Sequence, residues 1–228
     1  MSDALRLILF DVDGTLVDSQ GAIVDAMTAA CTANGLAAPD RAAILSIVGL
    51  SLDHAVLRLM PDLEAAARAA LVEGYKDAYH QQRQRHGAAA GSPLFPGARE
   101  LLTQLGRAPD LLLGVATGKS RRGLDALIAG HGLDHVFVTR QVADDHPSKP
   151  HPSMILTALA ETGCAPENAV MIGDTSFDME MAAAAGIAGI GVGWGYHPRD
   201  SLHRHARQVV DEFAALPAAL ESLWKVGA

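Results

Sequence analysis

The stretch RLILFDVDGT (residues 6–15) decides the fold, because a largely apolar run passes directly into carboxylates and a turn. The run at residues 6–10 is continuous rather than alternating, which is typical of a strand covered on both faces in a parallel sheet. Polar and small residues follow at its carboxyl end, namely Asp11, Asp13, Gly14 and Thr15. Ligands bind beyond the carboxyl ends of the strands in open α/β sheets, so we expect the chemistry to begin here.

Four more short apolar runs follow later in the chain: LLLGVAT (111–117), HVFVT (135–139), AVMIG (169–173) and IAGIGVG (187–193). Segments with the apolar spacing of amphipathic helices lie before and between these runs. A regular alternation of helix and strand after residue 96 demands a parallel sheet with right-handed crossovers. The chain is therefore predicted to have an α/β fold built on one parallel sheet.

The region between the first two strands breaks this rhythm, because it contains no strand pattern. Its apolar spacing predicts helices over 18–33, 40–47, 52–59 and 62–86. The glycine- and proline-rich segment 87–96 is typical of a linker that returns to the sheet. We therefore expect an α/β core domain of residues 1–15 and 93–228 with an inserted helical cap domain of residues 16–92.

The residues that follow the other strands would meet Asp11 and Asp13 at the same edge of the sheet. They are Thr117, Gly118, Lys149, Asp174 and Asp178. Each has a plainer explanation when taken alone, as a turn residue, a helix cap or a solvated lysine. Their convergence at strand ends is what points to a site.

Four motifs in this order resemble those of the haloacid dehalogenase (HAD) superfamily: DVDGT (11–15), ATG (116–118), SKPHP (148–152) and GDTSFD (173–178). The helical insertion is similar to the type 1 cap of that superfamily. The resemblance covers essentially the whole chain and implies a Rossmann-like parallel sheet core with an inserted α-helical cap. Within the superfamily the chain looks most like phosphoglycolate-phosphatase-like enzymes. That likeness implies a Mg²⁺-dependent phosphatase acting on a small phosphorylated metabolite.

A phosphate monoester is doubly negative, so an attacking nucleophile needs cations that relieve the repulsion. Asp11 and Asp174 offer oxygen ligands for Mg²⁺, and the backbone carbonyl of Asp13 is the third ligand that the resemblance implies. A free oxygen of Asp11 would attack phosphorus and form an aspartyl phosphate. Asp13 would protonate the leaving alkoxide and later activate water, a role that typically contributes about 10²–10⁴-fold.

The remaining candidates support that reaction. Thr117, the Gly118 amide and Lys149 would hold the transferring oxygens, as preorganised donors do in phosphoryl transfer. Thr15 would fix the loop after the first strand. Asp178 is expected to orient Lys149 or a metal-bound water rather than to bind the metal itself.

Other reactions fit parts of this pattern. A sugar phosphomutase of the β-phosphoglucomutase type shares the aspartyl phosphate, and the sequence does not separate it from a phosphatase. Dehalogenation needs neither a metal nor a second acid, so Asp13 and Asp174 argue against it. Phosphonate hydrolysis through a Schiff base would need a cap lysine, for which Lys76 is the one candidate. A signalling receiver domain also clusters aspartates but has no need of a helical insertion.

The composition limits partners and location. With 26 acidic and 18 basic side chains the net charge is −8, which argues against a nucleic-acid or anionic-membrane surface. The chain shows no apolar stretch near the roughly 20 residues that span a bilayer and no export signal. Cys31 and Cys164 lack metal spacing and indicate a reducing compartment. We expect a cytoplasmic protein, with monomer and dimer both open.

Some patterns mislead. GVATGKS (114–120) lacks one residue between the glycines of a P-loop, so Lys119 is expected to lie exposed in the first turn of a helix. His197, His203 and His205 indicate a polar loop and helix face rather than a metal site. In the cap, Arg41 or Arg58 is a hypothetical partner for a substrate carboxylate, although a solvated helix face is the favoured explanation of both.

Overall fold

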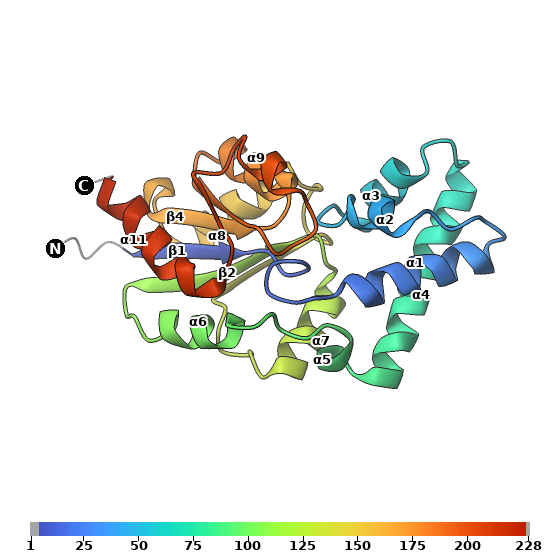
Figure 1. Ribbon diagram of the computed structural model, residues 1–228, viewed down its shortest axis with the longest axis horizontal. Helices are drawn as coiled ribbons and strands as arrows, with labels where there is room; N and C mark the ends of the chain where they lie inside the picture. Colours follow the sequence, from blue (N-terminus) through green and yellow to red (C-terminus); the bar gives the residue numbers. More distant parts are fainter. Residues whose placement is uncertain (1–4, 227–228) are drawn as a thin grey trace.

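The computed structural model describes residues 5–226, and its six strands form one parallel sheet of order β3-β2-β1-β4-β5-β6 (Figure 1). The strands are β1 (Arg6–Phe10), β2 (Leu111–Thr117), β3 (Thr139–Val142), β4 (Ala169–Gly173), β5 (Ala188–Val192) and β6 (Gln208–Val210). Because β1 lies between β2 and β4, the winding of the sheet reverses beside it, which is where ligands bind in such sheets. Residues 1–4 and 227–228 of the expected core lie outside the described part.

The third predicted strand, 135–139, is wrong, because β3 begins at Thr139. Phe137 reaches the core from the irregular segment before β3 instead, and Val138 is 60% exposed. The strand that forms is partly polar, and it can be buried because Glu161 accepts hydrogen bonds from Thr139 (2.6 Å) and Gln141 (2.8 Å). An apolar-run criterion misses such a strand, and it also missed the three-residue β6.

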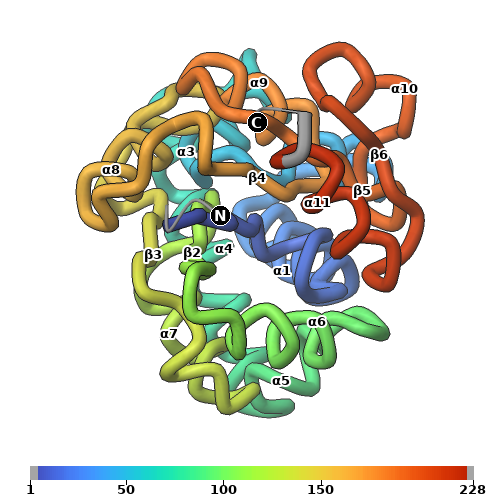
Figure 2. The backbone as a smooth tube through the Cα atoms, turned by 90° about the vertical axis from the view of Figure 1, so that its left-hand side faces the viewer, coloured from blue at the N-terminus to red at the C-terminus, as the bar shows by residue number. Residues whose placement is uncertain are grey.

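Helices cover both faces of the sheet, as the alternation of side chains along β1 requires. Ile8 and Phe10 point to one face, which α6 (Ala98–Leu105), α7 (Arg121–His131) and α11 (Leu216–Val226) cover. Leu7 and Leu9 point to the other, which α8 (Ser153–Thr162) and α9 (Ser176–Ala184) cover. Figure 2 shows α6 and α7 on one side of the strands and α8 and α9 on the other. A short helix, α10 (Arg199–Leu202), precedes β6.

The chain between β1 and β2 forms the helical insertion, which lies beyond one end of the sheet (Figure 1). Its helices are α1 (Gln20–Ala33), α2 (Arg41–Leu45), α3 (Leu52–Leu59), α4 (Ala65–His86) and α5 (Ala88–Gly91). The helices α1 to α4 enclose an apolar cluster that includes Met27, Ile44 and Leu71. α5 lies in the segment expected to be a linker. None of the helices within 5–226 has the combined length and apolarity needed to cross a bilayer.

The two links between the insertion and the sheet run side by side. Val17 pairs with Leu94 in an antiparallel bridge. The Asp18 amide donates to the Pro93 carbonyl at 2.8 Å, and the Phe95 amide donates to the Leu16 carbonyl at 3.0 Å. The insertion therefore leaves and rejoins the core at neighbouring points.

Candidate active site

Three carboxylates gather where β1 and β4 end, and we call Asp11, Asp174 and Asp178 the acidic cluster. Each offers an oxygen within 4.8 Å of the others, and all three are buried. The Lys149 ammonium lies among them, 2.9 Å from Asp11 Oδ1 and 2.5 Å from Asp178 Oδ1. Residues from three separate stretches of the chain, all selected by the strand-end argument, therefore share one buried site.

Asp178 is fixed by the start of α9. Thr175 caps that helix, and its hydroxyl accepts a hydrogen bond from the Asp178 amide at 3.3 Å. Asp178 Oδ2 in turn accepts from the Thr175 amide at 3.1 Å and from the Thr175 hydroxyl at 2.7 Å. With Lys149 on Oδ1, both oxygens of Asp178 have partners. This arrangement suits a carboxylate that orients the lysine.

The Asp174 carboxylate is held by one hydroxyl and one backbone amide, and two glycines pack closely against it. Its Oδ1 accepts from the Thr15 hydroxyl at 2.9 Å, and its Oδ2 accepts from the Tyr196 amide at 2.8 Å. A Cβ on Gly14, whose φ is +88°, would lie 2.3 Å from Asp174 Oδ2, and a Cβ on Gly195 would lie 2.1 Å from the Asp174 Cβ. Both positions therefore require glycine. The loop with Gly195 and Tyr196 was not predicted as part of the site, although its glycine-rich sequence was a usable signal.

The electrostatics of the acidic cluster follow from its burial. Desolvation raises the pKa of Asp11 from 3.8 to about 6, although Lys149 pulls it down. Burial and the charges of Asp11 and Asp178 raise the pKa of Asp174 well above its ordinary value. Burial alone would lower the pKa of Lys149, but the same two carboxylates outweigh it and hold that pKa above the ordinary value. The site thus has too little positive charge for its carboxylates.

A divalent cation would supply the missing charge. Both oxygens of Asp11 are buried and accept no hydrogen bond within the described residues, although Oδ1 lies close to the Lys149 ammonium. With Asp13, four carboxyl groups stand against two ammonium groups, Lys119 and Lys149, so full ionisation would leave two negative charges in excess. Oxygen donors with this excess suit a hard cation such as Mg²⁺.

Asp13 has a partner that sequence reasoning placed wrongly. Lys119 was expected to lie exposed in a helical turn, but it precedes Ser120, the N-cap of α7, and its side chain is only 9% exposed. Its ammonium lies 2.9 Å from both oxygens of Asp13 and donates to the Tyr79 hydroxyl at 3.3 Å. Spacing along the chain could not reveal this, because Tyr79 comes from α4.

A loop of the insertion presses on the end of β2, where Thr117 and Gly118 lie. A Cβ on Gly118 would lie 2.5 Å from the Gly49 carbonyl oxygen, so the close approach depends on glycine. The Ser51 amide donates to the Ser148 hydroxyl at 2.9 Å. His197 Nε2 lies 3.0 Å from the Ser46 carbonyl oxygen. The insertion is therefore seated on the sheet edge along this loop.

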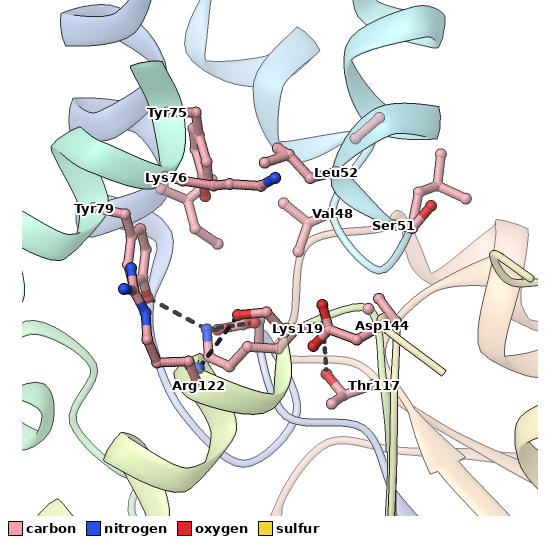
Figure 3. Close-up of a pocket in the computed structure, with 18 of the residues that line it drawn as sticks. Val48, Ser51, Leu52, Tyr75, Lys76, Tyr79, Thr117, Lys119, Arg122 and Asp144 are labelled. Atoms are coloured by element: carbon pink, nitrogen blue, oxygen red, sulfur yellow. Dashed lines mark hydrogen bonds and ion pairs between the residues drawn. The ribbon is translucent and has the colours of Figure 1, made fainter. Parts of the chain in front are cut away.

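A cavity of about 1090 Å³ remains between the insertion and the sheet edge. Asp11, Asp13, Thr117, Gly118 and Lys119 form its core side. In Figure 3, Tyr75, Lys76 and Tyr79 of α4 face Val48, Ser51 and Leu52 across it, above Thr117 and Lys119.

The two cap arginines do not line this cavity. Arg41 donates to the Gln20 side chain, and the Arg58 guanidinium lies over the Phe177 ring, 5.2 Å from its centre. Both contacts hold structure together rather than face a ligand.

Known proteins similar to this chain include two that carry phosphatase names and one named as a kinase. "Probable phosphatase IndB" of Dickeya dadantii (strain 3937) is 36% identical over 224 residues, covering 96% of this chain and 95% of that protein. "Tyrosine-protein kinase PtkA" of Mycobacterium tuberculosis (strain ATCC 25618 / H37Rv) is 33% identical, covering 96% and 72%. "Phosphoglycolate phosphatase" of Photorhabdus laumondii subsp. laumondii is 30% identical, covering 87% and 84%.

A family model described as "Haloacid dehalogenase-like hydrolase" matches residues 8–192. That match spans the sheet from β1 to β5, the helical insertion and every residue of the acidic cluster. It confirms the resemblance carried by the four motifs, and the likeness to phosphoglycolate phosphatases is confirmed by a relative of that name. The chain belongs to the haloacid dehalogenase-like hydrolases.

Proposed function

We propose that the protein is a Mg²⁺-dependent phosphatase that hydrolyses a small phosphorylated metabolite of the phosphoglycolate type through an aspartyl phosphate on Asp11. The observation that carries this proposal is the Asp11 carboxylate, which lines the cavity, is otherwise buried, and accepts no hydrogen bond within the described residues. Within the described residues Oδ2 has no donor beside it and Oδ1 faces the Lys149 ammonium alone, so the carboxylate retains lone pairs for phosphorus and for a metal. Its neighbour Lys149 supplies the charge that attracts a phosphate.

The metal site that goes with this reaction uses Asp11, Asp174 and the backbone carbonyl of Asp13. When bound, Mg²⁺ would neutralise charge on the carboxylates and on the phosphoryl oxygens. Thr15 and the Tyr196 amide hold Asp174 in place for this task. Asp178 keeps Lys149 beside Asp11.

The remaining residues act on the substrate. Thr117, the Gly118 amide and Lys149 hold the phosphoryl oxygens, and Asp13 passes a proton to the leaving oxygen and later takes one from water. Residues 16–92 act as the cap, which excludes water from the cavity. The free, buried thiols of Cys31 and Cys164 are in keeping with a reducing cytoplasm.

The test is phosphate release from a panel of phosphorylated metabolites, phosphoglycolate and sugar phosphates included, with Mg²⁺ and with EDTA. We expect Mg²⁺-dependent release by the wild type and a loss of at least about 10³-fold in D11N, the scale of losing a nucleophile. A folded D11N with substantial metal-dependent release would contradict the proposal.

Two further measurements separate neighbouring activities. Interconversion of sugar phosphates with negligible release of phosphate would identify a mutase. Since one relative carries the name of a tyrosine kinase, the same preparation is incubated with ATP and a tyrosine peptide. Transfer to the peptide that exceeds hydrolysis would also overturn the phosphatase assignment.

A further inference from the structure

The ion pair between Lys119 and Asp13 lies at the point where the insertion meets the sheet edge. We propose that Lys119, itself held by Tyr79 of the insertion, is a positioning residue that aims Asp13 at the leaving-group oxygen. The inference rests on the proposed phosphatase reaction and adds a residue to it.

The geometry of the pair is suited to positioning. The Lys119 ammonium lies 2.9 Å from Oδ1 and 2.9 Å from Oδ2 of Asp13, so it fixes both the place and the plane of the carboxylate. The two side chains are 9% and 12% exposed, and both residues line the cavity. A carboxylate at this wall can therefore reach a ligand while its orientation is set from one side.

The backbone around Lys119 supports the same reading. A Cβ on Gly123, in the first turn of α7, would lie 2.9 Å from the Lys119 Cγ. The stem of the lysine thus runs against the helix in a space that only glycine leaves open. The side chain is guided toward Asp13 rather than left free in solvent.

The partner from the insertion makes the arrangement conditional. Tyr79 accepts a hydrogen bond from the ammonium at 3.3 Å, and its ring centre lies 5.1 Å from the same nitrogen. The Tyr79 hydroxyl also lies 3.4 Å from the Ser92 hydroxyl, where the chain returns to the sheet. Lys119 therefore has both of its partners, Asp13 and Tyr79, only while α4 is seated against the sheet edge.

Lys119 stays protonated beside Asp13. Burial would lower its pKa, but the Asp13 carboxylate outweighs that effect and holds the pKa above the ordinary value of a lysine. Removing the ammonium leaves Asp13 without its partner in a largely buried place, where an unpaired carboxylate is unfavourable. The Asp13 carboxylate would then turn toward water and no longer point at the leaving-group oxygen.

The test compares two esters, an alkyl phosphate that the wild type hydrolyses and p-nitrophenyl phosphate, whose leaving group departs without a proton. General acid catalysis contributes about 10²–10⁴-fold. We expect K119M to lower kcat/KM for the alkyl ester by about 100-fold and for p-nitrophenyl phosphate by less than about 10-fold. K119R should recover part of the alkyl activity, and Y79F should show the same selectivity at about 3–10-fold.

Two controls make the result specific. K76M removes another ammonium that lines the cavity, one that pairs with Glu73 at the surface, and it should change both esters alike. In a D13N background, adding K119M should cost no further selectivity, because the lysine acts through Asp13.

Equal losses on both esters in a folded K119M, or a full further loss on top of D13N, would overturn the inference. Y79F decides the matter if K119M fails to fold, and an unselective Y79F would likewise overturn it. Failure of the underlying phosphatase proposal is distinct, because it would show as undiminished turnover in D11N.

Discussion

Two buried lysines pair with different aspartates of the site, and they are held in different ways. Lys149 lies between Asp11 and Asp178, and all of its charged contacts come from the core. Lys119 lies between Asp13 and Tyr79, so one of its contacts comes from the insertion. The difference teaches that the half of the site assigned to the nucleophile is complete in the sheet, whereas the half assigned to proton transfer is completed by α4.

The largest effect should come from the core lysine. K149M would leave Asp11 and Asp178 buried without their cation, which costs about 3–5 kcal/mol when one partner of a buried pair is removed. It would also remove the proposed donor to the phosphoryl group, worth about 10²–10³-fold in kcat. We expect a lower midpoint of thermal unfolding and a loss of activity that does not depend on the leaving group.

K119M is the matched comparison for that prediction, since it removes the same ammonium from the other half. Thermal melts of both variants should show the smaller loss of stability in K119M, because its side chain keeps some contact with water. Equal destabilisation would show that the two halves do not differ as described.

The next effect concerns the metal. D174N keeps the shape of the side chain but removes a carboxylate that lies beside Asp11. We expect the Mg²⁺ concentration needed for half-maximal activity to rise at least about 10–100-fold. That is the loss typical of residues that only support a metal ligand, so it is a lower bound for a ligand itself. T15V, which removes only the hydroxyl that holds Asp174, should give a smaller rise. No change in either variant would place the metal elsewhere.

A smaller effect concerns pH. The pKa of Asp11 is raised to about 6 in the folded protein, so between about pH 4 and 6 the folded chain keeps a proton that the unfolded chain has released. Asp11 therefore makes its full contribution to the free energy of unfolding below about pH 4. That contribution falls by about 2–3 kcal/mol as the pH rises through 6. In EDTA, D11N should therefore exceed the wild type in stability at pH 8, with a smaller margin at pH 5.

Mg²⁺ should reduce the difference in stability between D11N and the wild type at pH 8, because it binds the ionised carboxylates of the wild type. Urea unfolding of both proteins at pH 5 and pH 8 measures this difference. A margin that is the same at pH 5 and pH 8 would show that Asp11 is ionised throughout.

The smallest effect should come from Arg58, which packs on Phe177 and not on the cavity. R58A is expected to lower stability by about 0.5–1 kcal/mol, the usual value of an exposed cation–π contact, and to leave KM for acidic substrates unchanged. A selective rise in KM would restore the hypothesis that Arg58 meets a substrate carboxylate.

The sequence was sufficient for the core half of the site. Continuous apolar runs mark buried parallel strands, and parallel strands bring their carboxyl ends to one edge. Asp11, Thr117 and Asp174 could therefore be grouped before any coordinates existed. Lys149 was grouped with them by the same argument and by the motif SKPHP, although the strand before its loop was predicted with the wrong bounds.

The insertion-facing half could not be predicted in the same way. Lys119 was expected to be exposed, and Tyr79 was not considered, because their meeting depends on how α4 docks against the sheet edge. Helical spacing gives the face of a helix that is apolar, but it does not give the strand end on which that face comes to rest. For the same reason the sequence could not decide whether Arg41 or Arg58 faces a substrate carboxylate.

The paired links at Val17 and Leu94 have a consequence for how such a chain can change over time. Since the polypeptide departs from the sheet and comes back at adjacent positions, an insert of quite different size or shape could be grafted there without disturbing a single strand. The same carboxylates could thus serve different substrates when only the insertion between these two links changes.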